Sequence, residues 1–361
     1  MLKLAVKILL LFFIVLTASI LIRKFIDERL HILPYSYSDH YIHLKSSYLT
    51  IHKKDFNSVF IGSSHVFRQF DGHLFDSLAG NDRHLHSFNF GIQGLAASEL
   101  FYLSDHLLEN YKKNAGGKHV LPIKYLFVEL SKITFPDHLN LNTTRMYYWY
   151  DWNYYTFTLK AIFNSKNNLF PFKIAIAAMH SVGFLDKQFN FSYFNDVNNF
   201  YLREKYVNKV IENSKSNYNG YAPRVKTLKK LLADTSSLTL RKNGSAEQFQ
   251  KYENNPELLK NYNKAYLSKL KETIQKFNSE GIQVIFVFMP FSEKTQYDEI
   301  IPLLNQIDSN HKIELADSRK YPELYYAANA ADETHLNIKG AKIFTSLLAR
   351  KFEEITRISD N

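Results

Sequence analysis

Short apolar runs alternate with longer amphipathic stretches in two parts of the chain, residues 56–134 and 256–361. Short runs bounded by polar or turn-forming residues are typical of buried strands, and apolar positions three to four residues apart are typical of helices. The pattern predicts strands at residues 58–62, 86–91, 124–131, 282–290 and 312–318. It predicts helices around residues 72–79 and 96–112, from Pro256 to just before Gly281, from the fourth strand to about residue 308, and at 337–354. Because strands that alternate with helices pair in parallel through crossover connections, we expect an α/β domain with a parallel sheet.

This alternation stops between residues 135 and 255. The first part of that segment is rich in aromatic residues and is expected to be helical in places, and the second part is rich in Asn, Lys and Ser. The chain is therefore predicted to form one α/β domain in two halves, residues 56–134 and 256–361. A large, mostly helical insertion, residues 135–255, separates the halves.

The N-terminus carries the longest apolar run, "LAVKILLLFFIVLTASILI", residues 4–22. Its length is close to that of a helix that crosses a bilayer, and the alternatives are a cleaved signal peptide and a buried core helix. Since the following residues offer a poor cleavage site, we favour an uncleaved transmembrane signal anchor over residues 1–25, followed by a juxtamembrane segment, residues 26–55. Basic residues on the two sides of the run are nearly matched, so the positive-inside rule does not decide the orientation.

Composition narrows the class of protein. The 361 residues are 45% hydrophobic and 22% charged, which excludes global disorder. The chain has no cysteine, so disulfides, thiolate zinc sites and a cysteine nucleophile are all excluded. The formal net charge of +10 is spread along the chain, and its longest basic group, "RVKTLKK" at 224–230, is expected on a helix face. No stacking or helix-turn-helix signature accompanies the charge, so we expect no nucleic-acid partner, and no residue cluster calls for a metal or another cofactor.

Three loops fall where a parallel sheet collects functional groups, at the carboxyl ends of its strands and at the entrance to the last helix. They are Gly62–His65, Asn89–Gly94 and Asp332–Asn337. A serine at a strand-to-helix turn can present its hydroxyl for nucleophilic acyl transfer, and Ser64 has this position. The alternative role for Ser63 and Ser64 is that of turn or N-cap residues of the next helix. Gly62 would allow a tight turn.

A backbone N–H near the oxygen of a bound carbonyl contributes about 3 kcal/mol in the transition state of acyl transfer. Gly91 and Gly94 could bring such a donor close, and Gly94 is the better candidate. The alternative for both is an ordinary loop glycine.

Asp332 and His335 are three residues apart at the predicted entrance to the last helix, so they could lie on one face with the carboxylate orienting the imidazole. Ser63, His65 and Glu129 are possible additional site residues. We expect His65 at the rim, since adjacent residues on a turn seldom face each other. Glu129 ends an apolar strand and could be a buried structural acid or part of the site.

The segments "VFIGSSHV", "FNFGIQGLAA" and "DETHLNIKGAKIF" resemble the first, second and last sequence blocks of the SGNH (GDSL-type) hydrolases, in the same order. The resemblance covers residues 56–134 and 276–356 and not the insertion. It implies a three-layer α/β/α flavodoxin-like sandwich with Ser64 as nucleophile, His335 as base and Asp332 as its partner. It also implies an oxyanion hole formed by the backbone N–H groups of Ser64 and Gly94.

The chain departs from the family at two places. Ser63 replaces a frequent Asp before the nucleophile, and no Asn follows the strand "LFVEL", where the family places an oxyanion-hole Asn. The missing Asn, the predicted anchor and the aromatic insertion resemble the anchored branch of the family. That branch includes the D-alanyl transfer protein of teichoic acids and alginate acetyltransferases, which act beside a membrane-bound O-acyltransferase.

The resemblance implies a single-pass membrane protein whose C-terminal domain is periplasmic or extracellular. It would transfer or remove an acyl group on a cell-envelope or extracellular glycan through an acyl-Ser64 intermediate, with a membrane-bound O-acyltransferase as partner. Two alternatives stay open, a non-catalytic scaffold that binds an envelope polymer or a partner protein, and a lipid esterase that uses its anchor for access. A hydrogen-bonding distance between His335 and Ser64 would favour catalysis over the scaffold.

Overall fold

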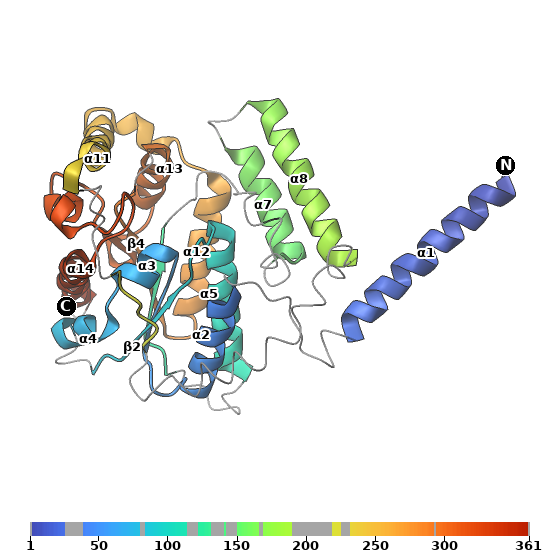
Figure 1. The fold of residues 1–361 in the computed structure, drawn as a ribbon, viewed down its shortest axis with the longest axis horizontal. Coiled ribbons are helices and arrows are strands. Elements are labelled where there is room, and N and C mark those ends of the chain that lie inside the picture. The colour runs from blue at the N-terminus through green and yellow to red at the C-terminus, as the bar shows by residue number, and fades with distance from the viewer. Residues whose placement is uncertain are drawn as a thin grey trace.

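The structure is a computed structural model that describes only part of the chain. The described residues are 2–25, 39–79, 84–113, 122–130, 141, 150–165, 169–189, 219–224, 232–291 and 294–359. Figure 1 shows how the helices and strands within these ranges are arranged.

The elements follow one another along the chain as helices and strands of an α/β fold (Figure 1). In the N-terminal half they are α1 (Leu2–Phe25), α2 (Asp39–Ile51), β1 (Ser58–Gly62), α3 (Ser64–Gln69), α4 (Gly72–Ala79), β2 (Ser87–Gly91), α5 (Ala97–Lys113), β3 (Tyr125–Glu129), α7 (Trp152–Asn164) and α8 (Phe170–Phe189). In the C-terminal half the α-helices and strands are α11 (Ser236–Asn254), α12 (Lys264–Asn278), β4 (Gln283–Phe288), α13 (Lys294–Asn305), β5 (Lys312–Glu314) and α14 (Ile338–Ser359). The 3-10 helices are η4 (Pro256–Lys260), η5 (Ser309–His311), η6 (Pro322–Tyr325) and η7 (Ala327–Asn329).

The five described strands form one parallel sheet in the order β2-β1-β3-β4-β5. The three central strands β1, β3 and β4 are predominantly apolar, as expected for strands that are buried on both faces. After β1, the next strand in sequence, β2, pairs on one side of β1, and the following strand, β3, pairs on the other side. Open parallel sheets bind ligands at such a reversal, in the crevice outside the carboxyl ends of the strands.

Helices cover both faces of the sheet (Figure 1). On one face α14 packs against α3 and α4, and on the other α5 contacts β1 while α12 contacts β4. The helical pair α7 and α8 packs beside this second layer, where α7 contacts α5 and α12. The sheet is therefore enclosed, and its carboxyl edge is left for the loops.

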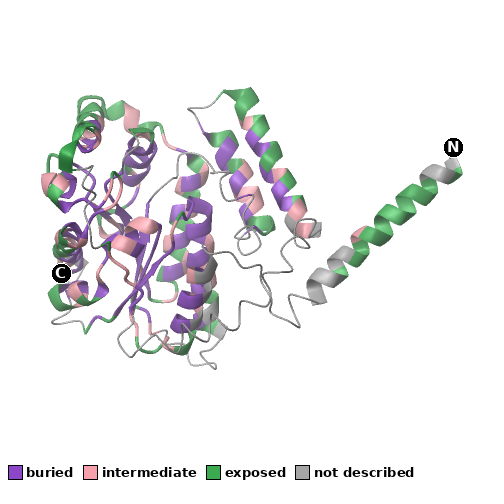
Figure 2. Ribbon diagram, in the orientation of Figure 1, coloured by how far each residue is buried: buried purple, intermediate pink, exposed green. Residues whose placement is uncertain are grey.

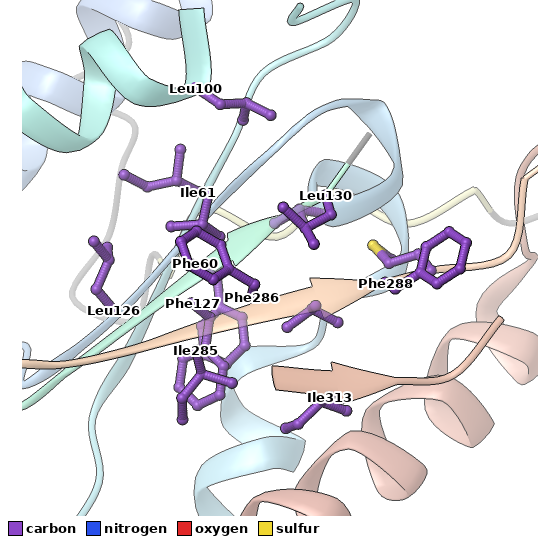
Figure 3. Close-up of a cluster of buried hydrophobic side chains, with 14 of the residues drawn as sticks. Phe60, Ile61, Leu100, Leu126, Phe127, Leu130, Ile285, Phe286, Phe288 and Ile313 are labelled. Atoms are coloured by element: carbon purple, nitrogen blue, oxygen red, sulfur yellow. The ribbon is translucent and has the colours of Figure 1, made fainter. Parts of the chain in front are cut away.

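Phenylalanine side chains join the sheet to the helical layer of α4 and α14. Figure 3 shows two of them, Phe60 and Phe127, among the buried side chains of the sheet. The rings of Phe60 and Phe127 stack with centroids 4.0 Å apart, and Phe127 also meets Phe75 of α4 and Phe352 of α14 at 5.5 and 5.4 Å. Fully burying one such side chain contributes about 1.5–3 kcal/mol. This cluster therefore holds the last helix of the chain against β1 and β3.

The structure confirms the five predicted strands and the predicted helices around residues 72–79 and 96–112, each to within a few residues. The last strand is shorter than expected and ends at Glu314, and the last helix continues to Ser359. The helix expected from Pro256 is divided into η4 and α12, because the side chain of Asn263 accepts hydrogen bonds from the N–H groups of Ala265 and Tyr266 and begins a new helix.

Helices α3 and α11 were not expected from the sequence. The short helix α3 begins directly after the first strand, and α11 lies in the Asn-, Lys- and Ser-rich segment. Only Leu238 and Tyr252 are buried apolar side chains of α11, whereas Arg241 donates hydrogen bonds to the carbonyl oxygens of Pro290 and Phe291. Hydrogen bonds from Arg241 to distant backbone carbonyl groups thus hold α11 in place, although this helix has little apolar periodicity.

The N-terminal segment is described in two pieces. Residues 39–51 of the predicted juxtamembrane segment form α2, whose buried side chains include Ile42, Leu44, Tyr48 and Leu49, so this helix is part of the folded domain. Helix α1 exposes most of its apolar residues (Figure 2). Among the residues that the structure describes, none of the helices has the length and apolar character needed to cross a membrane. The predicted transmembrane anchor is therefore not confirmed and stays a prediction.

Candidate active site

The candidate site lies where β1 and β3 end side by side. Ser63 follows β1, and Glu129 is the last residue of β3. The N–H of Ser63 donates to Glu129 Oε2 at 2.5 Å and its hydroxyl donates to Oε1 at 2.8 Å. Gly62 is required for space, since a Cβ there would lie 2.2 Å from Val66 Cγ2 and 2.5 Å from Glu129 Oε2. The glycine leaves room for the direct turn from β1 into α3, which brings Val66 back against it.

Ser64, His335 and Asp332 form a hydrogen-bonded chain. Ser64 Oγ lies 2.8 Å from His335 Nε2, although 271 positions separate the two residues in sequence. His335 Nδ1 lies 2.9 and 3.0 Å from the two carboxylate oxygens of Asp332. Ser64 is partly exposed. This is the order of nucleophile, base and orienting acid that serine acyl transfer requires.

A tight loop, and not one face of a helix, brings Asp332 and His335 together. Asp332 Oδ1 accepts hydrogen bonds from the backbone N–H groups of Thr334 and His335, at 2.9 and 2.8 Å. A β-bridge between Ala330 and Leu336 closes the loop. The pair lies at the entrance to the last helix as predicted, but both residues precede its first residue, Ile338, so the expected common helix face is not what joins them.

The packing of α14 against α3 and α4 places the loop that contains Asp332 and His335 next to the end of β1. The hydroxyl of Thr345 in α14 accepts a hydrogen bond from the N–H of Asp71 at 3.1 Å and donates to the carbonyl oxygen of Gln69 at 3.3 Å. Phe352 of the same helix enters the phenylalanine cluster. Since α3 begins at Ser64 and ends at Gln69, these contacts hold α14 directly against the element that carries the candidate nucleophile.

A second hydrogen-bond network, formed by Ser63, His65 and Glu129, lies next to Ser64. Ser63 is the N-cap of α3, because its hydroxyl oxygen accepts a hydrogen bond from the N–H of His65 at 3.3 Å. His65 Nδ1 lies 3.0 Å from Ser63 Oγ and 3.3 Å from Glu129 Oε1. The N-cap alternative thus holds for Ser63, while Ser64 faces His335.

His65 does not lie at the rim. Its side chain is 13% exposed, and its ring lies against that of His335 with centroids 5.3 Å apart and planes 27° apart. Phe291 contacts the ring of His65 edge-on at 5.1 Å. The reason is the buried carboxylate of Glu129, which draws the His65 imidazole inward and places it beside the candidate base.

Burial favours the neutral form of His335. It lowers the pKa of His335, and the nearby guanidinium of Arg224 acts in the same direction, whereas the hydrogen bond that the ring donates to the Asp332 carboxylate acts against it. Burial acts to raise the pKa of Asp332, but hydrogen bonds from His335 and from the N–H of Thr334 outweigh it and hold that pKa well below its usual range. At neutral pH the site therefore pairs a neutral base with an ionised carboxylate.

Gly94, the second candidate oxyanion donor, lies in a turn just after β2 and is exposed, with φ of +69°. The N–H of Ile92 donates to the carbonyl oxygen of Gly62 at 2.8 Å, so this loop begins beside the loop that carries Ser64. Gly91 permits this approach, since a Cβ there would lie 2.2 Å from the backbone nitrogen of Phe67. The segment after "LFVEL" where an Asn is missing, residues 131–140, lies outside the described residues.

Two residues near the site were not identified from the sequence. Arg224, the first residue of the "RVKTLKK" group, is exposed and forms an ion pair with Asp332. Residues 225–230 lie outside the described ranges. No sequence pattern signals the ion pair. The buried Lys45 of α2 donates hydrogen bonds to the carbonyl oxygens of Asn89 and Gly91, both at 2.8 Å, and so supports the loop that leads to Gly94. The helical spacing of apolar residues around Lys45 could have indicated its burial.

Comparison with known proteins identifies no relative. No family model matches the chain, and neither the curated proteins nor the solved structures contain a match. The interpretation of the site therefore depends on its own geometry.

If His335 serves as a general base, replacing Arg224 with alanine is expected to move the acid limb of the kcat/KM profile to higher pH. In the wild type that limb should lie below the ordinary imidazole pKa of 6.5, because the base acts when neutral and its pKa is lowered. Loss of the Arg224 charge removes one cause of this lowering and leaves Asp332 to stabilise the imidazolium. Rates of ester hydrolysis measured across the acid range test this. An Arg224→Lys variant keeps the charge and should retain the wild-type profile, and an unchanged profile in Arg224→Ala would contradict the electrostatic role.

Proposed function

We propose that the protein is a serine acyltransferase or esterase that uses Ser64 to carry an acyl group. The observation that supports this most is the 2.8 Å separation of Ser64 Oγ from His335 Nε2, with Asp332 on the other ring nitrogen. A serine that served only as a helix cap would not need an imidazole oriented by a carboxylate. In this chain the capping role belongs to Ser63.

The proposed reaction has two steps. In the first, Ser64 Oγ attacks the carbonyl carbon of an acyl ester while its proton passes to His335 Nε2. The bond to the leaving alcohol then breaks, and the alcohol oxygen takes that proton, which leaves an acyl-Ser64 ester. In the second step an acceptor hydroxyl gives its proton to His335 Nε2 and attacks the acyl carbonyl, and Ser64 Oγ leaves and recovers the proton. Water as acceptor gives an esterase, and a sugar hydroxyl gives a transferase.

The fold agrees with the family resemblance. The strand order 2-1-3-4-5 is also that of flavodoxin-like sheets, and the helices on both faces are compatible with the three layers that the SGNH resemblance implies. We propose that the substrate is an acylated cell-envelope or extracellular glycan, as in the anchored branch of that family. The same resemblance supports a membrane location through α1, a periplasmic or extracellular catalytic domain and a membrane-bound O-acyltransferase as partner.

Trapping of the acyl-enzyme tests this proposal. The full-length protein in detergent micelles is mixed with p-nitrophenyl acetate, quenched in acid and analysed by intact-protein and peptide mass spectrometry. We expect one acetyl group on the peptide that contains Ser64, and its transfer to an added oligosaccharide would identify a transferase. A folded protein that neither gains an acetyl group nor releases p-nitrophenol would favour the non-catalytic scaffold instead.

A further inference from the structure

The outward face of α8, from Phe170 to Leu185, is predominantly apolar, and the polar residues Lys173 and Ser181 of this range are only partly exposed. Every exposed residue in this range is apolar, namely Phe170, Pro171, Phe172, Ile174, Ala175, Ala178, Met179, Val182 and Leu185. Helices that face water normally carry charged and polar residues on that side. Helix α14 of the same chain does so, since its exposed residues are Lys339, Lys342, Ser346, Arg350, Glu354 and Arg357. The outer face of α8 is therefore unlike a water-facing surface.

The opposite face of α8 is already used for packing. His180 and Phe184 are buried there, and His180 Nδ1 lies 2.7 Å from the hydroxyl of Tyr150. The ring of Tyr155 from α7 stacks on Phe184 at 4.4 Å, and its hydroxyl lies 2.8 Å from Ser181 Oγ. These aromatic and polar contacts fix the rotation of α8 on α7. The apolar outer face is consequently presented by the fold and is not a core face turned outward.

Helix α1, which contacts α8, identifies the medium that covers this face. Eight successive residues, Ile8 to Val15, are each between 51% and 62% exposed. Successive helix positions differ by about 100°, so these side chains point in every direction around the axis. A folded partner would cover one side of such a helix, whereas an apolar solvent covers all of it. Figure 2 shows both helices with exposed residues along their length.

We propose that the outer face of α8, defined by Phe172, Ile174, Met179, Val182 and Leu185, lies in the interface of a lipid bilayer and contacts its acyl chains. Lipid suits this face better than a protein surface, because protein interfaces carry a polar rim and every fully exposed residue of this face between Phe170 and Leu185 is apolar. A helix that lies in the interface buries one apolar face without crossing the bilayer. The proposal rests on the membrane location in the proposed function and adds a second contact, which would orient the α/β domain relative to the bilayer.

Single-cysteine labelling tests this proposal, because the natural chain has no cysteine. Val182→Cys places a label on the α8 face, where the valine is 66% exposed and its removal leaves the packed face intact. Leu11→Cys on α1 is the reference for the anchor, and Ser346→Cys on the outer face of α14 is the water-facing control. Each full-length variant carries an environment-sensitive fluorophore and is reconstituted into vesicles of phosphatidylcholine and phosphatidylglycerol. Quenching by acyl-chain nitroxides is compared with quenching by aqueous iodide.

We expect nitroxide lipids to quench the labels at positions 11 and 182 several-fold more strongly than the label at position 346, and iodide to show the reverse order. Quenching of the position 182 label by iodide, with position 11 quenched by lipid, would overturn the α8 contact while leaving the anchor. A position 182 label shielded from both quenchers would mean that protein covers the face, which also overturns the proposal. If nitroxide lipids quench neither the label at position 11 nor the label at position 182, the membrane location itself is overturned. The acyl-enzyme experiment tests the reaction at Ser64 independently of this result.

Discussion

Replacing Ser64 with alanine is expected to abolish labelling of the full-length protein by a fluorophosphonate and to lower kcat for an activated ester by about ten-thousand-fold or more. The reason is chemical, since the hydroxyl that lies 2.8 Å from His335 Nε2 is the atom that would form the acyl bond. Alanine leaves the backbone of α3 in place, so stability should change little. Gel fluorescence and stopped-flow release of p-nitrophenol measure the two effects.

Ser63→Ala is the matched control for this experiment. It removes a hydroxyl from the neighbouring position, but that hydroxyl donates to Glu129 and caps α3 and does not contact His335 in the hydrogen bonds described above. We expect Ser63→Ala to keep fluorophosphonate labelling, with lower thermal stability. Labelling that persists in Ser64→Ala, or is lost only in Ser63→Ala, would mean that the nucleophile has been assigned to the wrong residue.

Replacing Glu129 with alanine is expected to lower the free energy of unfolding by about 3 kcal/mol at neutral pH. Glu129 is 1% exposed and accepts hydrogen bonds from the N–H and the hydroxyl of Ser63 while facing His65. Its removal leaves buried donors without an acceptor and an imidazole without its carboxylate, and both effects cost free energy. Urea unfolding of the full-length protein in detergent micelles measures the loss. A loss near zero would mean that water replaces the carboxylate at no cost.

The stability difference between the wild type and Glu129→Gln is expected to shrink in acid. Burial acts to raise the pKa of Glu129, but hydrogen bonds and charge from His65, with the hydrogen bonds from Ser63, outweigh it and hold the pKa below the ordinary value of 4.5. A carboxyl group with a lowered folded-state pKa stabilises the protein above its unfolded pKa, and this contribution is lost as the pH falls through the folded value. Glutamine does not titrate. An equal difference at neutral pH and at pH values below 4.5 would contradict an ionised Glu129.

Most strands and several helices could be predicted from the order of apolar and polar residues along the chain. The strands at 58–62, 86–91 and 124–131 were predicted because buried parallel strands are short apolar runs with polar ends. Helix α11 was not predicted, since few of its buried residues are apolar and the carbonyl groups of Pro290 and Phe291 hold it through Arg241. Apolar spacing reports burial of a helix face and carries no information about such non-local hydrogen bonds.

The sequence by itself determined the α/β class, the three loops at the carboxyl edge of the sheet and the candidates Ser64, Asp332 and His335, because strand ends and residue types are local properties. Only the tertiary structure decided which groups meet. Packing of Phe352 and Thr345 brings the loop before α14 to the start of α3, across 271 positions, and the pairing of β1 with β3 places Glu129 under Ser63. Arg224 reaches Asp332 for the same reason, since contacts between distant segments depend on how helices pack on the sheet and leave no periodic pattern in the chain.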